Sequence, residues 1–239
     1  MILKPLPEQF IATREAMHQI AYFAVAPARH QAEARMGLRA APGGFGTPEF
    51  NGQIARVEGT LLVHEQHGNV ATQEISTVRD ACEFFGHDYE VSWFEGFHDP
   101  LQPMDPDLPL QVGDEAARAL GNWFNFGFAV LTRLRGHGSA GDDVSEAQLW
   151  PEHFDAAIEM GDEESGKRAS YGASPGDVDH PAPYLYVAAW ETVDRSDSFW
   201  NDPHFNGASL GYDALLESGD PAGTALSFLT AGLRILRGR

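Results

Sequence analysis

The segment from Asp114 to Arg135 constrains the fold more than any other part of the chain. It predicts a long helix that ends at Gly136, and from Trp123 to Leu131 it is apolar almost all round. Such a helix has no face that suits water, so we expect other elements to pack around it. Its most apolar part, Ala116 to Leu134, contains Arg118, Asn122, Asn125 and Arg133. They indicate a buried helix and not a membrane span.

Helices are also expected at both ends of the chain. Residues 6 to about 26 carry apolar side chains at helical spacing, and Pro27 is expected to end this helix. Residues 221–236 predict another helix, with Asp220 placed to cap its first turn. The chain therefore has N-terminal, central and C-terminal helices.

Strands are predicted between these helices. Residues 35–40 predict a strand that enters a Gly/Pro turn, and residues 54–75 predict two strands around a turn at His67, Gly68 and Asn69. A short helix is then expected from a cap at Ser76 to Phe85. Its inward residues would be Val78, Ala81, Cys82 and Phe85.

The stretch from 149 to 161 has two interpretations. With a period of two residues it is a strand from His153 to Met160, and with a period of 3.6 residues it is a short helix that stops at Gly161. The next residues favour the strand, because an acid-rich turn and a second strand-like run at 168–173 complete a hairpin.

These elements predict the fold class. A third strand-like run covers 184–190, and in the preceding hairpin Lys167 or Arg168 would lie across from Glu159. No β-α-β rhythm is present, which favours an α+β fold: an antiparallel sheet with hairpins, packed against the N-terminal, central and C-terminal helices. At 239 residues and 43% hydrophobic content, residues 1–239 are expected to form a single domain. Prolines at every third position predict a stiff connector at about 96–113.

Charge and composition exclude several classes of function. The formal net charge is −19, which argues against a nucleic-acid partner and against binding to anionic membranes. The N-terminus lacks the apolar core and small-residue cleavage site of a signal peptide, and Cys82 is the only cysteine, so no intrachain disulfide can form. The expected location is the cytoplasm.

Two glycine-containing motifs do not fit the chemistry that they suggest. Residues 172–176 match the G-x-S-x-G pattern of hydrolases, but Pro175 lacks the N–H that would stabilise an oxyanion, so a turn is expected. Residues 42–48 lack both the last glycine of a dinucleotide fingerprint and the lysine of a phosphate-binding loop. They predict a glycine turn, and Arg39 just before it is placed to hold an anionic group of a ligand.

No metal site is expected. The pairs His64/His67 and His153/Asp155, and the cluster at 177–180, lack the ligand spacings of zinc or calcium sites. Cys82 lies on the apolar face of a short helix and is expected to be a core residue, not a nucleophile. The sequence indicates no particular cofactor.

Several runs resemble a group of actinobacterial proteins of uncharacterised function. They are LWPEHFDAAIE, YGASPGD, HPAPYLYVAAWE, FWNDPHFNGASL and SGDPAGTALSFL, with TREAMHQIAYFAVAPAR and MGLRAAPGGFGTPEF in the first half. The order of elements is more distantly similar to a broader bacterial family of unknown function. The resemblance implies one domain and favours a strand at 154–160, and it carries no catalytic residue over to this chain.

Two functions are weighed. The first is binding of a small ligand in a pocket between sheet and helices, with a possible enzymatic activity. The candidate binding residues are Arg39, His153, Asp155 and Tyr171. In that site Asp155 would orient His153 as a proton-transferring pair. The alternative is a non-catalytic domain that binds another protein through the aromatic stretch from Trp190 to Phe205.

Overall fold

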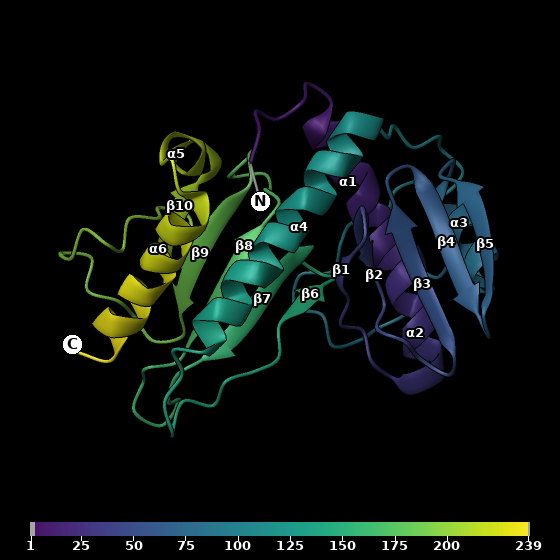
Figure 1. The fold of residues 1–239 in the computed structure, drawn as a ribbon. Coiled ribbons are helices and arrows are strands. Elements are labelled where there is room, and N and C mark those ends of the chain that lie inside the picture. The colour runs from purple at the N-terminus through teal and green to yellow at the C-terminus, as the bar shows by residue number, and fades with distance from the viewer. Residues whose placement is uncertain (1–2, 239) are drawn as a thin grey trace. The chain divides into compact units, whose positions relative to one another are not determined.

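The computed structural model describes residues 3–238, which form two compact units (Figure 1). Unit 1 contains residues 3–5, 125–148 and 155–238, and unit 2 contains residues 6–124 and 149–154. The fold is α+β, with two five-stranded antiparallel sheets where the sequence predicted one. Two boundaries between the units fall inside a long helix and inside a short strand, and the Pro-rich segment at 96–113 lies within unit 2.

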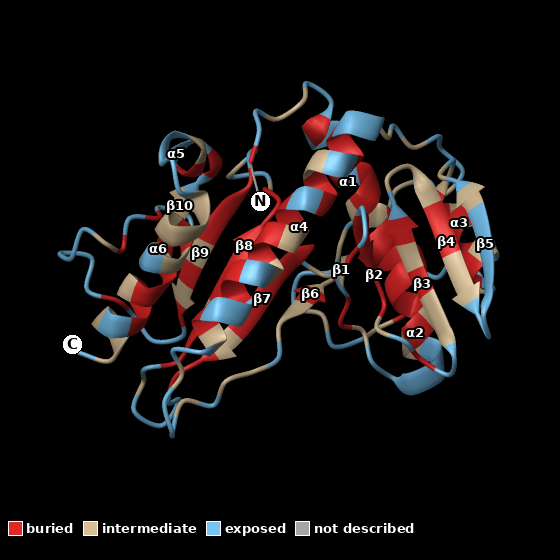
Figure 2. Cartoon of the chain, in the orientation of Figure 1, coloured by how far each residue is buried: buried red, intermediate tan, exposed pale blue. Residues whose placement is uncertain are grey.

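Unit 2 is built on a sheet whose strands follow one another in chain order. They are β1 (Arg39–Ala41), β2 (Gly44–Gly46), β3 (Gln53–Glu58), β4 (Leu61–Gln66) and β5 (Asn69–Glu74). The sequence predicted two strands over 54–75, and the structure has three, because Gly59 at φ 58° allows a further tight turn. The edge strand β5 is exposed along most of its length (Figure 2).

The N-terminal helix does not end at Pro27, so that prediction is wrong. Helix α1 (Phe10–Ile20) continues through a π-helical segment (Ala21–Val25) into α2 (Ala26–Glu33). In the π-helical segment the amide of Ala26 bonds to the carbonyl of Ala21, five residues back, which widens the turn. Pro27 then lies in the first turn of α2, where a missing N–H does little harm.

Side chains in α3 (Val78–Phe85) and just after it bind the carbonyls around this wide turn. In a regular α-helix the Phe23 carbonyl would accept from residue 27, but proline has no N–H to donate. The Cys82 thiol donates to this oxygen with an S–O distance of 3.2 Å, and His87 Nε2 donates to the Ala24 carbonyl at 2.8 Å. Burial raises the pKa of the Cys82 thiol to about 12, so the thiol keeps its proton.

The predicted inward face of α3 is confirmed, and its cap differs by one residue. Val78, Ala81, Cys82 and Phe85 are buried. The Thr77 side chain accepts from the Asp80 amide at 3.0 Å, whereas Ser76 donates to the Asp80 carboxylate at 2.6 Å. Thr77, and not Ser76, therefore caps the helix.

Unit 1 contains β7 to β10 of the second sheet, whose order is β10-β9-β8-β7-β6, and only the first residue of β6 belongs to it. The apolar face of this sheet is covered by α6 (Pro221–Leu236) and the C-terminal half of α4 (Asp114–Arg135), and both helices have the predicted bounds. At Gly127 an added Cβ would lie 2.6 Å from the Cβ of Ala173, so only glycine lets α4 come this close to the sheet. The strands are β6 (Gln148–Trp150), β7 (Asp155–Met160), β8 (Ala169–Ser174), β9 (Tyr184–Ala189) and β10 (Gly207–Gly211), and α5 (Tyr212–Glu217) follows them. Within residues 3–238 no helix is both long and apolar enough to cross a membrane.

The stretch at 149–161 divides at Phe154. The strand interpretation is confirmed for β7, but His153 lies outside the strand because Phe154 has a left-handed backbone with φ 55°. The Phe154 ring is buried and stacks on His18 with ring centroids 5.1 Å apart. His18 Nε2 also donates to the carbonyls of Pro151 at 2.9 Å and Glu152 at 3.2 Å. One imidazole thus holds this turn.

We expect Cys82→Ala to lower the free energy of unfolding by about 1–3 kcal/mol, because it removes the hydrogen bond from the thiol to the buried Phe23 carbonyl. Pro27→Ala supplies an amide N–H at the position from which a helix normally donates to that oxygen. In the Pro27→Ala background, Cys82→Ala should therefore cost at least about 1 kcal/mol less. Urea unfolding of the four proteins of this double-mutant cycle measures the coupling, and strictly additive effects would contradict this role of Cys82.

His18 makes the stability depend on pH. Burial lowers the pKa of His18 from 6.5 to about 4, so between these values the unfolded chain binds a proton that the folded protein does not. The free energy of unfolding should therefore fall as the pH drops from 6.5 to 4, by up to about 3 kcal/mol from this group. In His18→Gln this part of the pH dependence should vanish. Equal slopes for both proteins in chemical unfolding would show that His18 is not the group responsible.

Candidate ligand pocket

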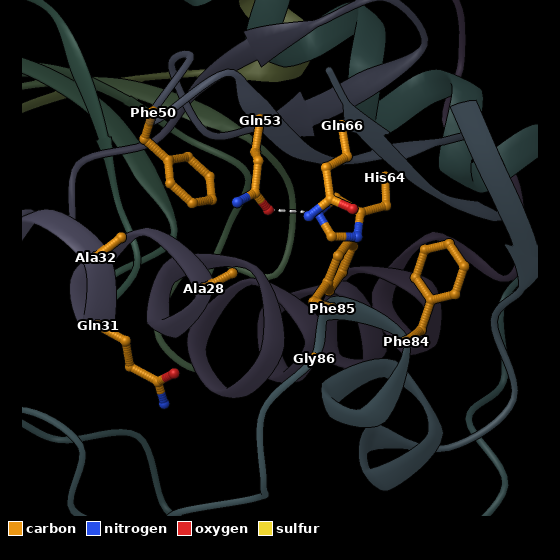
Figure 3. A pocket seen from close by; sticks show the side chains of 10 residues that line it. All are labelled: Ala28, Gln31, Ala32, Phe50, Gln53, His64, Gln66, Phe84, Phe85 and Gly86. Atoms are coloured by element: carbon orange, nitrogen blue, oxygen red, sulfur yellow. Dashed lines mark hydrogen bonds between the residues drawn. The ribbon is translucent and has the colours of Figure 1, made fainter. Parts of the chain in front are cut away.

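A pocket of about 480 Å³ lies in unit 2 between strands β3 and β4 and helices α2 and α3 (Figure 3). Small-molecule sites in proteins typically have volumes of roughly 300–1,000 Å³. Its lining residues are Ala28, Gln31 and Ala32 of α2, Phe50, Gln53, His64 and Gln66 from the sheet side, and Phe84, Phe85 and Gly86 at the end of α3. The pocket is therefore large enough for a small organic ligand.

The register of β3 and β4 places three polar side chains on one face of the sheet. Gln53 pairs directly with Gln66, and His64 pairs with Ala55 two residues along. Alternate residues of a strand share a face, so Gln53, His64 and Gln66 project together towards the helices. Deeper on the same face, the sheet is apolar and belongs to the core.

Aromatic side chains form the apolar walls. Phe50 and Phe85 are 4% and 6% exposed, and Phe84 is half-buried. The rings of Phe84 and Phe85 lie edge-on to His64, with centroids 6.2 and 5.7 Å away. Because Cys82 anchors α3 to the π-helical segment, these two rings are carried by a helix that is fixed in place.

The pocket is lined without any charged side chain. Its polar groups are the amides of Gln31, Gln53 and Gln66 and the imidazole of His64. His64 Nε2 lies 3.0 Å from Gln53 Oε1, and burial lowers the pKa of His64, which keeps the ring neutral at neutral pH. In a chain of net charge −19, this lining is unusually neutral.

The four residues predicted for a ligand site do not line this pocket. Arg39 is exposed on β1, and the side chain of His153 is 59% exposed, with its Nε2 4.0 Å from the Glu152 carboxylate. Asp155 and Tyr171 are both buried. Tyr171 pairs with Ile158, three residues from Asp155, so these two side chains point to opposite faces of the second sheet.

Asp155 takes part in a pair that the sequence reasoning missed. The Tyr186 hydroxyl donates to its carboxylate, and burial, together with this negative charge, raises the pKa of Tyr186 well above its usual value. The ring of Tyr186 reaches Asp155 by crossing Gly172 on β8. A Cβ at Gly172 would lie 2.3 Å from the ring carbon Cζ, so glycine is required there.

A second polar group in unit 1 surrounds His180. Its Nε2 lies 2.9 Å from the buried Asp202 carboxylate, and its Nδ1 lies 3.5 Å from that of Asp177, which also accepts from the Tyr184 hydroxyl at 2.6 Å. The two carboxylates face opposite nitrogens of one ring, so they do not converge on a common point. Among residues 3–238, no three His, Cys, Asp or Glu side chains are arranged to hold a metal ion.

The aromatic stretch from Trp190 to Phe205 is exposed only in part. Trp190 is 46% exposed, Trp200 is 5% exposed and Phe205 is half-buried. Arg168 lies over the Trp190 ring, 4.9 Å from its centroid, and pairs with Glu159 at 2.9 Å. The predicted ion pair is therefore present, with Arg168 as the partner, but the predicted register is wrong, because Ser170 lies across from Glu159.

Comparisons with protein-family models, curated proteins and solved structures give no match to this chain. The pocket has to be judged from its own residues. The one sequence signal for it is that Gln53, His64 and Gln66 occupy inward positions of strands that otherwise bury apolar side chains. Alternation alone gave no reason to prefer these polar residues to the many others in the chain.

Gly172→Ala should lower the free energy of unfolding by about 1–3 kcal/mol, because the methyl group displaces the Tyr186 ring and breaks its hydrogen bond to Asp155. Gly211→Ala is a matched control, since a Cβ there meets nothing within 4 Å. The control should leave stability within about 0.5 kcal/mol of wild type. Thermal and urea unfolding measure both, and equal stability of the two variants would refute the steric argument.

Proposed function

We propose that the protein binds a small, uncharged aromatic ligand in the pocket of unit 2. The observation that carries this proposal is the lining: three phenylalanines and three glutamines surround one neutral histidine, and no charged side chain is among them. Phenyl rings stack on a planar ligand, and each glutamine amide offers both a donor and an acceptor. These groups together fix both the plane and the orientation of a ligand.

The same lining disfavours charged ligands. A carboxylate or an ammonium group that enters the pocket loses hydration and finds no opposite charge to replace it. An amide or ketone of the same shape loses much less hydration and can bond to the glutamines. Selection by charge is therefore the property that separates this pocket from a general apolar surface.

Three probes of nearly the same shape test the proposal: benzamide is neutral, benzoate is an anion and benzamidine is a cation. We expect benzamide to bind with a dissociation constant on the order of 1 mM, as suits a ligand of this size, and the two ions to bind at least about tenfold more weakly. Saturation-transfer NMR on the full chain measures all three.

Ala32→Trp at the pocket and Ala12→Trp on α1 form a matched pair, because both alanines are exposed residues of helices in unit 2. Benzamide binding should be lost in the first variant and kept in the second. If benzamide binds no better than the ions, or if both variants bind it equally, the pocket is not the site and the proposal fails.

A further inference from the structure

We infer that Gln53 selects the ligand by donating a hydrogen bond to a carbonyl-type acceptor, and that His64 is the positioning residue that holds Gln53 in this orientation. The inference rests on the proposed small-ligand function and names the group that the ligand must present. Aromatic ketones, amides and lactams belong to this class. Aromatic hydrocarbons of the same shape do not.

The contact between the two residues sets the orientation of the amide. Gln53 Oε1 lies 3.0 Å from His64 Nε2, and an amide oxygen can only accept, so the inference requires the tautomer of His64 that carries its proton on Nε2. With its oxygen held by His64, Gln53 has its NH₂ group left for another partner. Figure 3 shows that nitrogen on the side away from His64, towards Phe50 and Ala28. A donor therefore faces the space that a ligand would fill.

His64 is itself held in place. Its ring packs edge-on against Phe84 and Phe85, and it lies opposite Ala55 on the neighbouring strand. Turning the Gln53 amide over would set its NH₂ against the Nε2 proton of His64, donor against donor. In the Nε2–H tautomer the orientation of Gln53 is thus fixed before a ligand arrives, which limits the entropy lost on binding.

The other two amides are less suited to selection. Gln31 and Gln66 are exposed, whereas Gln53 is half-buried next to the buried ring of Phe50. A hydrogen bond that is shielded from water discriminates more strongly than one at an exposed rim, because the loss of a partner is not made good by solvent. The hydrogen bond from Gln53 to the ligand is therefore expected to contribute most to the selection among ligands.

Acetophenone and α-methylstyrene test the inference, because they differ only in a carbonyl oxygen replaced by a methylene group. On wild-type protein we expect ligand-observed NMR titration to give about fivefold to tenfold tighter binding of the ketone. Gln53→Met should reduce this ratio to about one, while Gln111→Met, an exposed glutamine outside the pocket, should leave it unchanged. The ratio separates selection from a general loss of structure.

The role of His64 is tested by two substitutions. His64→Phe keeps a ring and removes the donor, so the amide can turn and the ratio should fall towards one. His64→Gln returns an N–H donor and should restore part of the preference. If Gln53→Met fails to fold, Gln53→Glu replaces it: the carboxylate should abolish ketone binding and favour benzamidine.

Each outcome decides between the two proposals. Equal binding of acetophenone and α-methylstyrene to the wild type overturns the inference while the proposed function stands. A preference for acetophenone that persists in both Gln53→Met and His64→Phe also overturns it, because another group must then bind the carbonyl. Failure of benzamide, acetophenone and α-methylstyrene alike to bind removes the proposed function and the inference with it.

Discussion

The Phe23 carbonyl receives no hydrogen bond from position 27 of its helix, and the protein supplies one from a thiol 59 residues further along the chain. A buried carbonyl left without a donor costs about 1–3 kcal/mol, so α3 has to lie where Cys82 meets this oxygen. The contact from His87 to Ala24 adds a second anchor of the same kind. The arrangement of the helices in unit 2 therefore depends on backbone chemistry at one wide turn as well as on apolar packing.

The pocket depends on this anchor. Helix α2 continues from the π-helical segment, and α3 is bonded to it, so two walls of the pocket are set by the same pair of hydrogen bonds. The third wall is the sheet face that carries Gln53 and His64. A proline that does not touch the lining thus helps to determine the distance between the side chains that form it. π-Helical turns are often found at functional sites.

The fold class and most helices could be predicted from local patterns, because apolar periodicity, caps and turns act over a few residues. The bounds of α4 and α6 and the inward face of α3 are of this kind. The stop at Pro27 was wrong because a π-helical turn, which has no sequence signature of its own, moved proline into a position where it is tolerated. His153 lies outside its predicted strand because Phe154 has a left-handed backbone, which the alternation of apolar and polar residues does not predict. The pocket was missed because its residues come from separate segments and become neighbours only through tertiary packing.

The neutral lining has a consequence for the kinetics of binding. A protein of net charge −19 surrounds itself with a negative potential that slows the approach of anions and is weakened by added salt. This potential exerts no net force on a neutral ligand, so the association rate of such a ligand is insensitive to ionic strength. The acidic surface and the uncharged pocket thus discriminate against anions at two stages, first during diffusion to the protein and then during desolvation inside it.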